Sequence, residues 1–187
     1  MNRRALILAL PALAIRPAKA APEPYTLDAK NSRVAFIFVV GGQGVRGTMP
    51  VASARIALDL ANIASSSVAT TLDPTRARTG FALATDAMTG PGILDVERHP
   101  KITFRSTAIQ VSGLGGQMEG DLTIRGVTRP VTLGASLYRR TGIDDQNNLT
   151  VQISGEISRA AFGASAFSDL VADSVTLDIL ARVTRAA

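Results

Sequence analysis

Residues 120–133 read GDLTIRGVTRPVTL. Apolar and polar side chains alternate on both sides of Gly126. A period of two is typical of a strand with one buried face and one wet face, because successive side chains point to opposite sides. Glycine supplies the positive φ that a tight turn needs. The stretch therefore predicts a hairpin that bends at Gly126, with four inward residues: Leu122, Ile124, Val131 and Leu133.

The same alternation continues along the chain in both directions from this hairpin. It recurs at residues 56–60, 102–104, 151–153 and 175–179. Glycine-rich and Asp/Asn-rich stretches separate these segments and favour turns. The best candidate for a helix is a short one within residues 81–95, because Gly90-Pro91-Gly92 limits its length. Many short strands with little helix predict an all-β barrel or sandwich.

One segment does not alternate. Residues 34–40 read VAFIFVV and are apolar on both faces. A strand that a helix or loop covers from outside would have this pattern. Such a strand could also line a cavity with one face while its other face packs under residues 81–95, and the two interpretations are compatible.

The first twenty residues have the order of a secretory signal peptide. A basic start at Arg3-Arg4 precedes an apolar run at residues 5–15 and the small-x-small site Ala18-Lys19-Ala20. The run is shorter than the roughly 20 residues that span a bilayer. We expect residues 1–20 to be removed and residues 21–187 to form one domain. Arg3-Arg4 leaves both Sec and twin-arginine export open.

Removal of that segment changes the charge balance. Four of the twenty basic residues lie in it and none of the fifteen acidic ones does, which leaves sixteen basic against fifteen acidic residues. A net charge of about +1 with scattered basic residues does not favour a nucleic-acid surface.

The sequence contains no recognisable catalytic constellation. His99 is its single histidine and it has no cysteine, whereas zinc and copper sites recruit several such ligands. No Gly-x-Ser-x-Gly elbow presents a nucleophile. Asp59, Asp121 and Asp178 alternate with apolar residues and are expected to face water. We therefore expect neither an enzyme nor a metal or cofactor site.

The hairpin at 120–133 resembles the signature hairpin of the YceI-like family, the lipocalin-like polyisoprenoid-binding proteins of bacteria. Other matching pieces follow in the family's order. They are Tyr25-Thr26-Leu27-Asp28, Ser32-Arg33-Val34-Ala35-Phe36, residues 94–104, Arg159 with Phe162-Gly163, and residues 175–183. The resemblance covers roughly residues 25–183.

This resemblance implies a lipocalin-like extended eight-stranded antiparallel β-barrel with one short helix. It also implies a periplasmic binding protein that encloses a polyisoprenoid, such as a polyprenyl quinone or polyprenyl phosphate. The alternative is a closed barrel with a structural or stress-response interaction role and no ligand. A membrane-bound partner, and a monomer or a homodimer, are left open.

Twelve side chains are expected to contact the lipid, although each could equally be ordinary core. Eight would line the tunnel and four would lie near its mouth. They are Phe36, Phe38, Ile102, Phe104, Leu122, Ile124, Phe162 and Phe167, and then Phe81, Leu83, Met88 and Leu94.

Overall fold

The computed structural model describes residues 21–112, 115–138 and 146–186. The expected signal peptide, residues 1–20, lies outside them. Eight strands follow one another around a ring. They are β1 (Glu23–Leu27), β4 (Val51–Leu58), β5 (Ser67–Leu72), β7 (Ile102–Ser112), β8 (Gly115–Ile124), β9 (Val127–Tyr138), β10 (Asn148–Ser158) and β11 (Val171–Arg185). Strand β11 returns to β1 through the pairs Tyr25↔Arg185 and Leu27↔Val183, and this pairing closes the barrel.

Three further strands extend the barrel at one end. Strand β2 (Arg33–Val40) pairs with the first part of β11, and β3 (Gln43–Met49) pairs with β2 and with the short β6 (Arg78–Thr79). The pairings recorded among all these strands are antiparallel. The predicted extended eight-stranded antiparallel barrel is confirmed.

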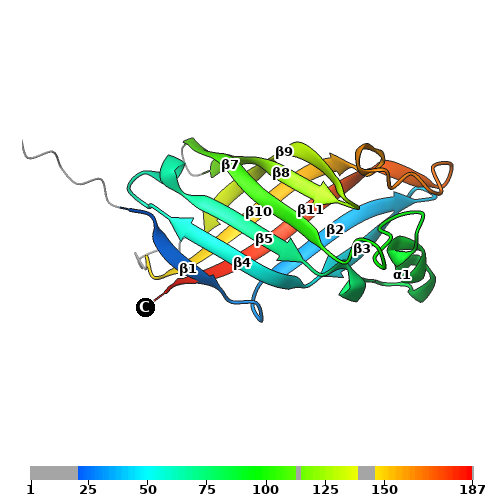
Figure 1. Ribbon diagram of the computed structural model, residues 1–187, viewed down its shortest axis with the longest axis horizontal. Helices are drawn as coiled ribbons and strands as arrows, with labels where there is room; N and C mark the ends of the chain where they lie inside the picture. The colour runs from blue at the N-terminus through cyan, green and yellow to red at the C-terminus, as the bar shows by residue number, and fades with distance from the viewer. Residues whose placement is uncertain (1–20, 113–114, 139–145, 187) are drawn as a thin grey trace, which may run out of the picture.

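Helical structure in the described residues is short. The α-helix α1 (Ala82–Thr89) ends at Gly90, within the predicted segment. Three single-turn 3-10 helices are η1 (Ile63–Ser65), η2 (Pro74–Arg76) and η3 (Ala160–Phe162). Helix α1 lies at one end of the elongated barrel, and the C-terminal end of β11 lies at the other end (Figure 1).

The predicted hairpin is formed by β8 and β9. The pair Ile124↔Val127 leaves a two-residue turn at Arg125 and Gly126, whose φ values are 52° and 74°. Positive φ at both central residues matches the right-handed twist of the flanking strands. Leu122, Ile124 and Leu133 are buried, which places the apolar face inside the barrel.

Two apolar clusters lie at the two ends of the barrel interior. The cluster around Tyr25, Leu149 and Val183 packs the end near the C-terminus. The cluster around Phe36, Met49, Ile102, Ile124 and Phe162 occupies the end near α1. Each is built from inward residues of several strands, as the period-two pattern requires.

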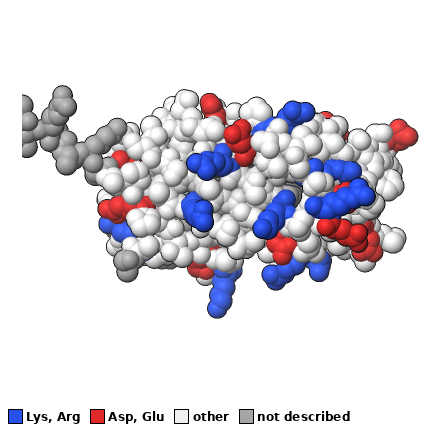
Figure 2. All heavy atoms as spheres, viewed as in Figure 1, with Lys and Arg blue, Asp and Glu red and all other residues white. Residues whose placement is uncertain are grey.

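The outer surface carries charges of both signs. Figure 2 shows Lys and Arg side chains interspersed with Asp and Glu side chains on one face of the described residues. On the outside of β11, Asp178 accepts hydrogen bonds from Arg46 and from Gln152 Nε2 at 2.6 Å. The guanidinium of Arg33 lies 3.8 Å from the same carboxylate.

The predicted outward orientation of Asp59 is wrong. Asp59 follows the end of β4 and is only 6% exposed. Its Oδ1 accepts from the backbone N–H groups of Ala61 and Asn62, and its own N–H donates to Ser66 Oγ at 2.9 Å. A strand-period pattern fails here because the side chain closes a turn instead of continuing the strand.

Candidate functional site

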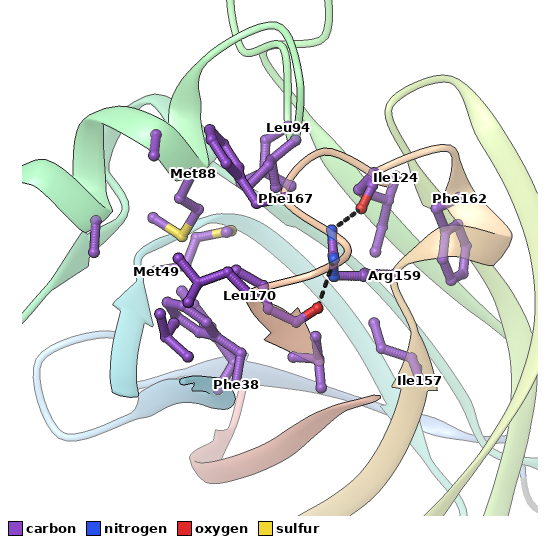
Figure 3. A pocket seen from close by; sticks show the side chains of 18 of the residues that line it. Phe38, Met49, Met88, Leu94, Ile124, Ile157, Arg159, Phe162, Phe167 and Leu170 are labelled. Atoms are coloured by element: carbon purple, nitrogen blue, oxygen red, sulfur yellow. Dashed lines mark hydrogen bonds between the residues drawn. The ribbon is translucent and has the colours of Figure 1, made fainter. Parts of the chain in front are cut away.

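An apolar cavity of about 380 Å³ lies at the α1 end of the barrel (Figure 3). Twenty described residues line it, and all but one of them are apolar. They are Phe36, Phe38, Val40, Met49, Leu83, Ala84, Ala87, Met88, Ile93, Leu94, Ile102, Ile124, Ile157, Arg159, Phe162, Ala164, Phe167, Leu170, Val171 and Val175. Such a volume falls in the range of about 300–1,000 Å³ that is usual for small-molecule sites.

Strand β2 and helix α1 supply opposite parts of the wall. On β2 the alternate residues Phe36, Phe38 and Val40 face the cavity, and the two phenyl rings stack with their centroids 6.3 Å apart. On α1 the lining residues share one helical face. Helix α1 therefore lies on the cavity side of β2 and does not cover its outer face, contrary to one interpretation of residues 34–40. The outer residue Val39 is partly exposed.

A glycine on the neighbouring strand makes room for Phe36. A Cβ atom at Gly47, the register partner of Phe36, would lie 2.3 Å from Phe36 Cζ and 2.4 Å from Cε2. Only a residue without a side chain permits this contact. The ring therefore lies against the barrel wall and leaves the centre of the cavity open.

The charged lining residue is Arg159, whose guanidinium is engaged by backbone carbonyls. Nε donates to Ala172 O at 3.0 Å, and Nη1 donates to Ala164 O and Ala166 O at 2.5 and 2.8 Å. Nη2 donates to Val171 O at 2.8 Å. Arg159 is 8% exposed, so these bonds offset the cost of burying its charge. The side chain of Arg159 thus stabilises the conformation of the β10–β11 loop (Figure 3).

The carboxylate of Asp173 accepts hydrogen bonds from the start of the same loop. Hydrogen bonds from the Ser158 side chain and from the backbone N–H of Ala160 hold the pKa of Asp173 below its ordinary value, and the charge of Arg159 acts in the same direction. The Ala160 N–H lies 2.8 Å from Asp173 Oδ1. Asp173 therefore fixes the entry to η3 from outside, while Arg159 fixes the loop from inside.

The cavity reaches solvent at its α1 end. Leu83, Phe167 and Leu170 line it and yet are 85%, 56% and 56% exposed. The loop that carries Phe167 is tied to the segment after α1 by the bond from Ala166 N to Gly92 O, 3.3 Å long. The mouth is therefore an apolar rim that continues the cavity wall.

Nine of the twelve side chains singled out from the sequence line this cavity, and three do not. Phe81 precedes α1 and points into solvent, with 66% of its surface exposed. Phe104 and Leu122 face the barrel interior but belong to the packed core next to the cavity. The nine that line it are Phe36, Phe38, Leu83, Met88, Leu94, Ile102, Ile124, Phe162 and Phe167.

Eleven lining residues were not singled out. Strand alternation could have identified Val40, Ile157 and Val175, because each shares a face with inward residues of its own strand. Arg159 carried no such signal, because an arginine at a strand end is usually exposed. The others, which come from α1, the loops and strand ends, are Met49, Ala84, Ala87, Ile93, Ala164, Leu170 and Val171.

The described part of the chain contains neither a cluster of metal-ligating side chains nor a membrane-spanning helix. No group of three or more His, Cys, Asp or Glu side chains there is placed to hold a metal ion. None of the helices within residues 21–112, 115–138 and 146–186 is long and apolar enough to cross a membrane.

Known proteins resemble this chain over most of its length. A UPF0312 protein of Vibrio cholerae is 25% identical over 184 residues, which cover 91% of this chain and 95% of that protein. Protein YceI of Escherichia coli is 29% identical over 141 residues, 73% of each chain.

Two solved structures share the fold. Burkholderia cenocepacia BcnA superposes with a TM-score of 0.77 at 24% identity, over 84% of this chain and 99% of that one. The Campylobacter jejuni YCEI protein superposes with a TM-score of 0.64 at 16% identity, over the whole of both chains. A barrel of this kind is consistent with binding a hydrophobic ligand. Because the YceI-like domain also matches residues 25–183, the chain belongs to the YceI-like family.

Proposed function

We propose that the protein is a periplasmic binding protein that encloses the chain of a polyisoprenoid, such as a polyprenyl quinone or polyprenyl phosphate, or a similar long apolar lipid. The observation that carries the proposal is the cavity of about 380 Å³, whose apolar wall continues into the exposed rim of Leu83, Phe167 and Leu170. A hydrocarbon chain gains about 0.8 kcal/mol for each methylene that it transfers from water into such a wall.

The wall also favours one orientation of the lipid. The four recorded hydrogen bonds of the Arg159 guanidinium go to carbonyls of its own chain, and the remaining lining side chains have no polar atoms. A buried quinone or phosphate would lose its hydrogen bonds to water without replacement. The apolar chain therefore enters the cavity first, and the polar head stays at the rim.

The rival function is a closed barrel without a ligand. The end of the interior around Tyr25, Leu149 and Val183 is packed in that way. The α1 end is not, since space remains between Phe38, Met88 and Ile157. The cavity therefore favours binding over a purely structural role.

The first test is to identify what the protein carries. Mass spectrometry of an organic extract of protein purified from its host should detect a long-chain isoprenoid. Adding a polyprenyl quinone to delipidated protein at a hundredfold excess over the dissociation constant should stabilise it by about 2.7 kcal/mol. Folded protein that yields no lipid and gains no thermal stability would favour the closed barrel.

A pair of neighbouring substitutions locates the binding site. Phe38→Asp puts a charge on the cavity wall and should abolish quinone binding, whereas Val39→Asp puts it on the outer face of β2 and should leave binding intact. The unfolding free energy of both variants is measured alongside. Retained binding in folded Phe38→Asp protein would place the lipid elsewhere.

The proposed compartment has its own test. Mature protein recovered from the host should begin at Ala21, after the Ala18-Lys19-Ala20 site. Soluble cytoplasmic protein that still begins at Met1 would contradict the periplasmic assignment.

A further inference from the structure

We propose that the exposed apolar side chains around the cavity mouth insert into the surface of a lipid bilayer. A hydrocarbon chain would then pass from the bilayer into the cavity without crossing water. The insertion stands on the exposed surface alone, whereas the passage of the chain rests on the proposed function. The inserting side chains, called the mouth patch below, are Phe81, Leu83, Phe167 and Leu170.

Exposed apolar side chains gather at this end of the barrel. Seven large ones are exposed in residues 21–112, 115–138 and 146–186, and four of the seven belong to the mouth patch. Helix α1, which Phe81 directly precedes, and the β10–β11 loop lie at the same end of the barrel (Figure 1). Single exposed apolar side chains are ordinary on a protein surface, but a gathered patch marks an interaction site.

Phe81 has no evident role inside the folded protein. Its side chain is 66% exposed, does not line the cavity and packs against neither buried cluster. It occupies the N-cap of α1, with φ −132° and ψ 131°. That position favours Ser, Thr, Asp or Asn, because their side-chain oxygen accepts a hydrogen bond from the first turn of the helix. A phenyl ring cannot do so, and the ring is presented to the solvent instead.

Phe167 is a second aromatic residue in an unfavourable backbone position. Its φ is 58°, in the left-handed region, where Gly and Asn are common and bulky residues are rare. The side chain is nevertheless 56% exposed. Two phenylalanines of the mouth patch thus stand where the local backbone suits a small polar residue, which points to a contact outside the folded chain.

A bilayer fits this patch by its chemistry. Residues 79–94 and 160–171, which carry the patch, contain only two charged residues, Asp86 and Asp169. Few charges would therefore lose their hydration on insertion. Exposed Phe and Leu side chains are typical of surfaces that enter the boundary between lipid headgroups and acyl chains. Leu83, Phe167 and Leu170 also line the cavity, so the hydrocarbon of the bilayer would meet the cavity wall directly.

The test is co-flotation of the delipidated protein, purified from its host, with vesicles of zwitterionic phosphatidylcholine. The wild type should bind the vesicles, and added salt should not release it, because the patch inserts by apolar contact. Phe81→Ser should weaken vesicle binding by about tenfold. It should leave the binding of decanol in solution unchanged, since Phe81 does not line the cavity. Its melting temperature should not fall, because serine is a favourable N-cap.

The matched control is Tyr138→Ser. Tyr138 is 62% exposed, close to the value for Phe81, but it follows Leu137, which packs at the opposite end of the barrel. Its replacement should change vesicle binding by less than about twofold. Phe167→Asn is an independent second variant, because asparagine tolerates positive φ. It should weaken vesicle binding as Phe81→Ser does.

The outcomes separate insertion from ligand binding. Weaker vesicle binding in Phe81→Ser and Phe167→Asn, but not in Tyr138→Ser, supports insertion of the mouth patch. Wild-type protein that ignores the vesicles, or equal vesicle binding by all the folded variants, overturns it. Attachment to anionic vesicles alone that salt releases overturns it too, as does a dimer that Phe81→Ser dissociates in the absence of vesicle binding. Protein that binds decanol but no vesicles keeps the proposed function, whereas protein that binds vesicles but no decanol keeps only the insertion.

Discussion

Two adjacent residues of the β8–β9 hairpin lie on opposite faces of the sheet. Ile124 is buried and lines the cavity, whereas Thr123 points outward and shares a hydrogen bond of 2.8 Å with Thr128. Ile124→Asp should lower the unfolding free energy by several kcal/mol, because it places an unpaired charge in an apolar interior. Thr123→Asp should cost less than about 1 kcal/mol. Denaturant unfolding of both variants measures the contrast, and equal losses would contradict the inward orientation of Ile124.

A pH effect is expected at Asp178 on the outer surface. The hydrogen bond from Arg46 is the main cause that holds its pKa below the ordinary value, and the bond from Gln152 and the charge of Arg33 act in the same direction. A carboxylate whose pKa is lower in the folded state stabilises the protein above its unfolded pKa, near 3.8. That stability is lost as the pH falls through the folded pKa.

Asp178→Asn should therefore destabilise the protein by about 0.2–1 kcal/mol at neutral pH, as exposed ion pairs usually do. The difference from the wild type should vanish in strong acid. Unfolding measured from pH 7 to pH 2, with Arg46→Gln as the second arm of a double-mutant cycle, checks both points. A difference that is the same at every pH, or that persists in Arg46→Gln, would rule out the ion pair as its cause.

Residue by residue, the sequence predicts the face of a side chain better than its depth. Period-two alternation places Ile102 and Phe104 on one face, and both do face the interior. It cannot tell that Ile102 lines the cavity and Phe104 does not, because the depth of a side chain in the barrel depends on the tilt of the strands. The alternation does not predict the burial of Arg159 either. Its hydrogen-bond acceptors are carbonyls of the loop that follows it in the chain, and no local pattern indicates them.

At the scale of elements, the β10–β11 loop depends on one side chain. Arg159 donates to four carbonyls spread from Ala164 to Ala172, and these bonds position Phe162, Phe167 and Leu170 around the cavity. Arg159→Lys keeps the charge but offers a single ammonium group, which does not reproduce the planar fork of the guanidinium. Each buried carbonyl left unpaired costs about 1–3 kcal/mol.

The expected result for Arg159→Lys is a loss of at least about 1 kcal/mol in unfolding free energy and faster amide hydrogen exchange across residues 160–171. Arg129→Lys is a suitable control, because Arg129 is exposed and donates to a single carbonyl, Ala161 O, at 3.2 Å. If both lysine variants behaved alike, the loop would not depend on Arg159.

The sequence predicts these elements unequally, and for physical reasons. The β8–β9 hairpin could be placed from its alternation and from Gly126, because both signals are local. The position of α1 could be bracketed by Gly90-Pro91-Gly92, but its packing on the cavity side of β2 could not. That packing depends on contacts between segments distant in the chain, which no local pattern contains.

At the scale of the whole molecule, the two ends of the barrel should respond differently to ligand. The end near α1 surrounds the cavity, while the end around Tyr25, Leu149 and Val183 is already packed. A polyprenyl quinone should therefore slow amide exchange most in α1 and residues 160–171, because a bound ligand suppresses the local opening of segments that line its site. Exchange mapped with and without quinone tests this pattern. Protection confined to the packed end would contradict the position of the site.

The location of the C-terminal end of β11, on the far side of the barrel from α1, has a practical consequence (Figure 1). An affinity handle fused to that terminus sits the full length of the barrel away from the rim of Leu83, Phe167 and Leu170. Protein anchored to a sensor chip through such a handle points its opening toward the flowing solution. Vesicles or detergent micelles passed over that chip can then reach the opening without steric hindrance from the support.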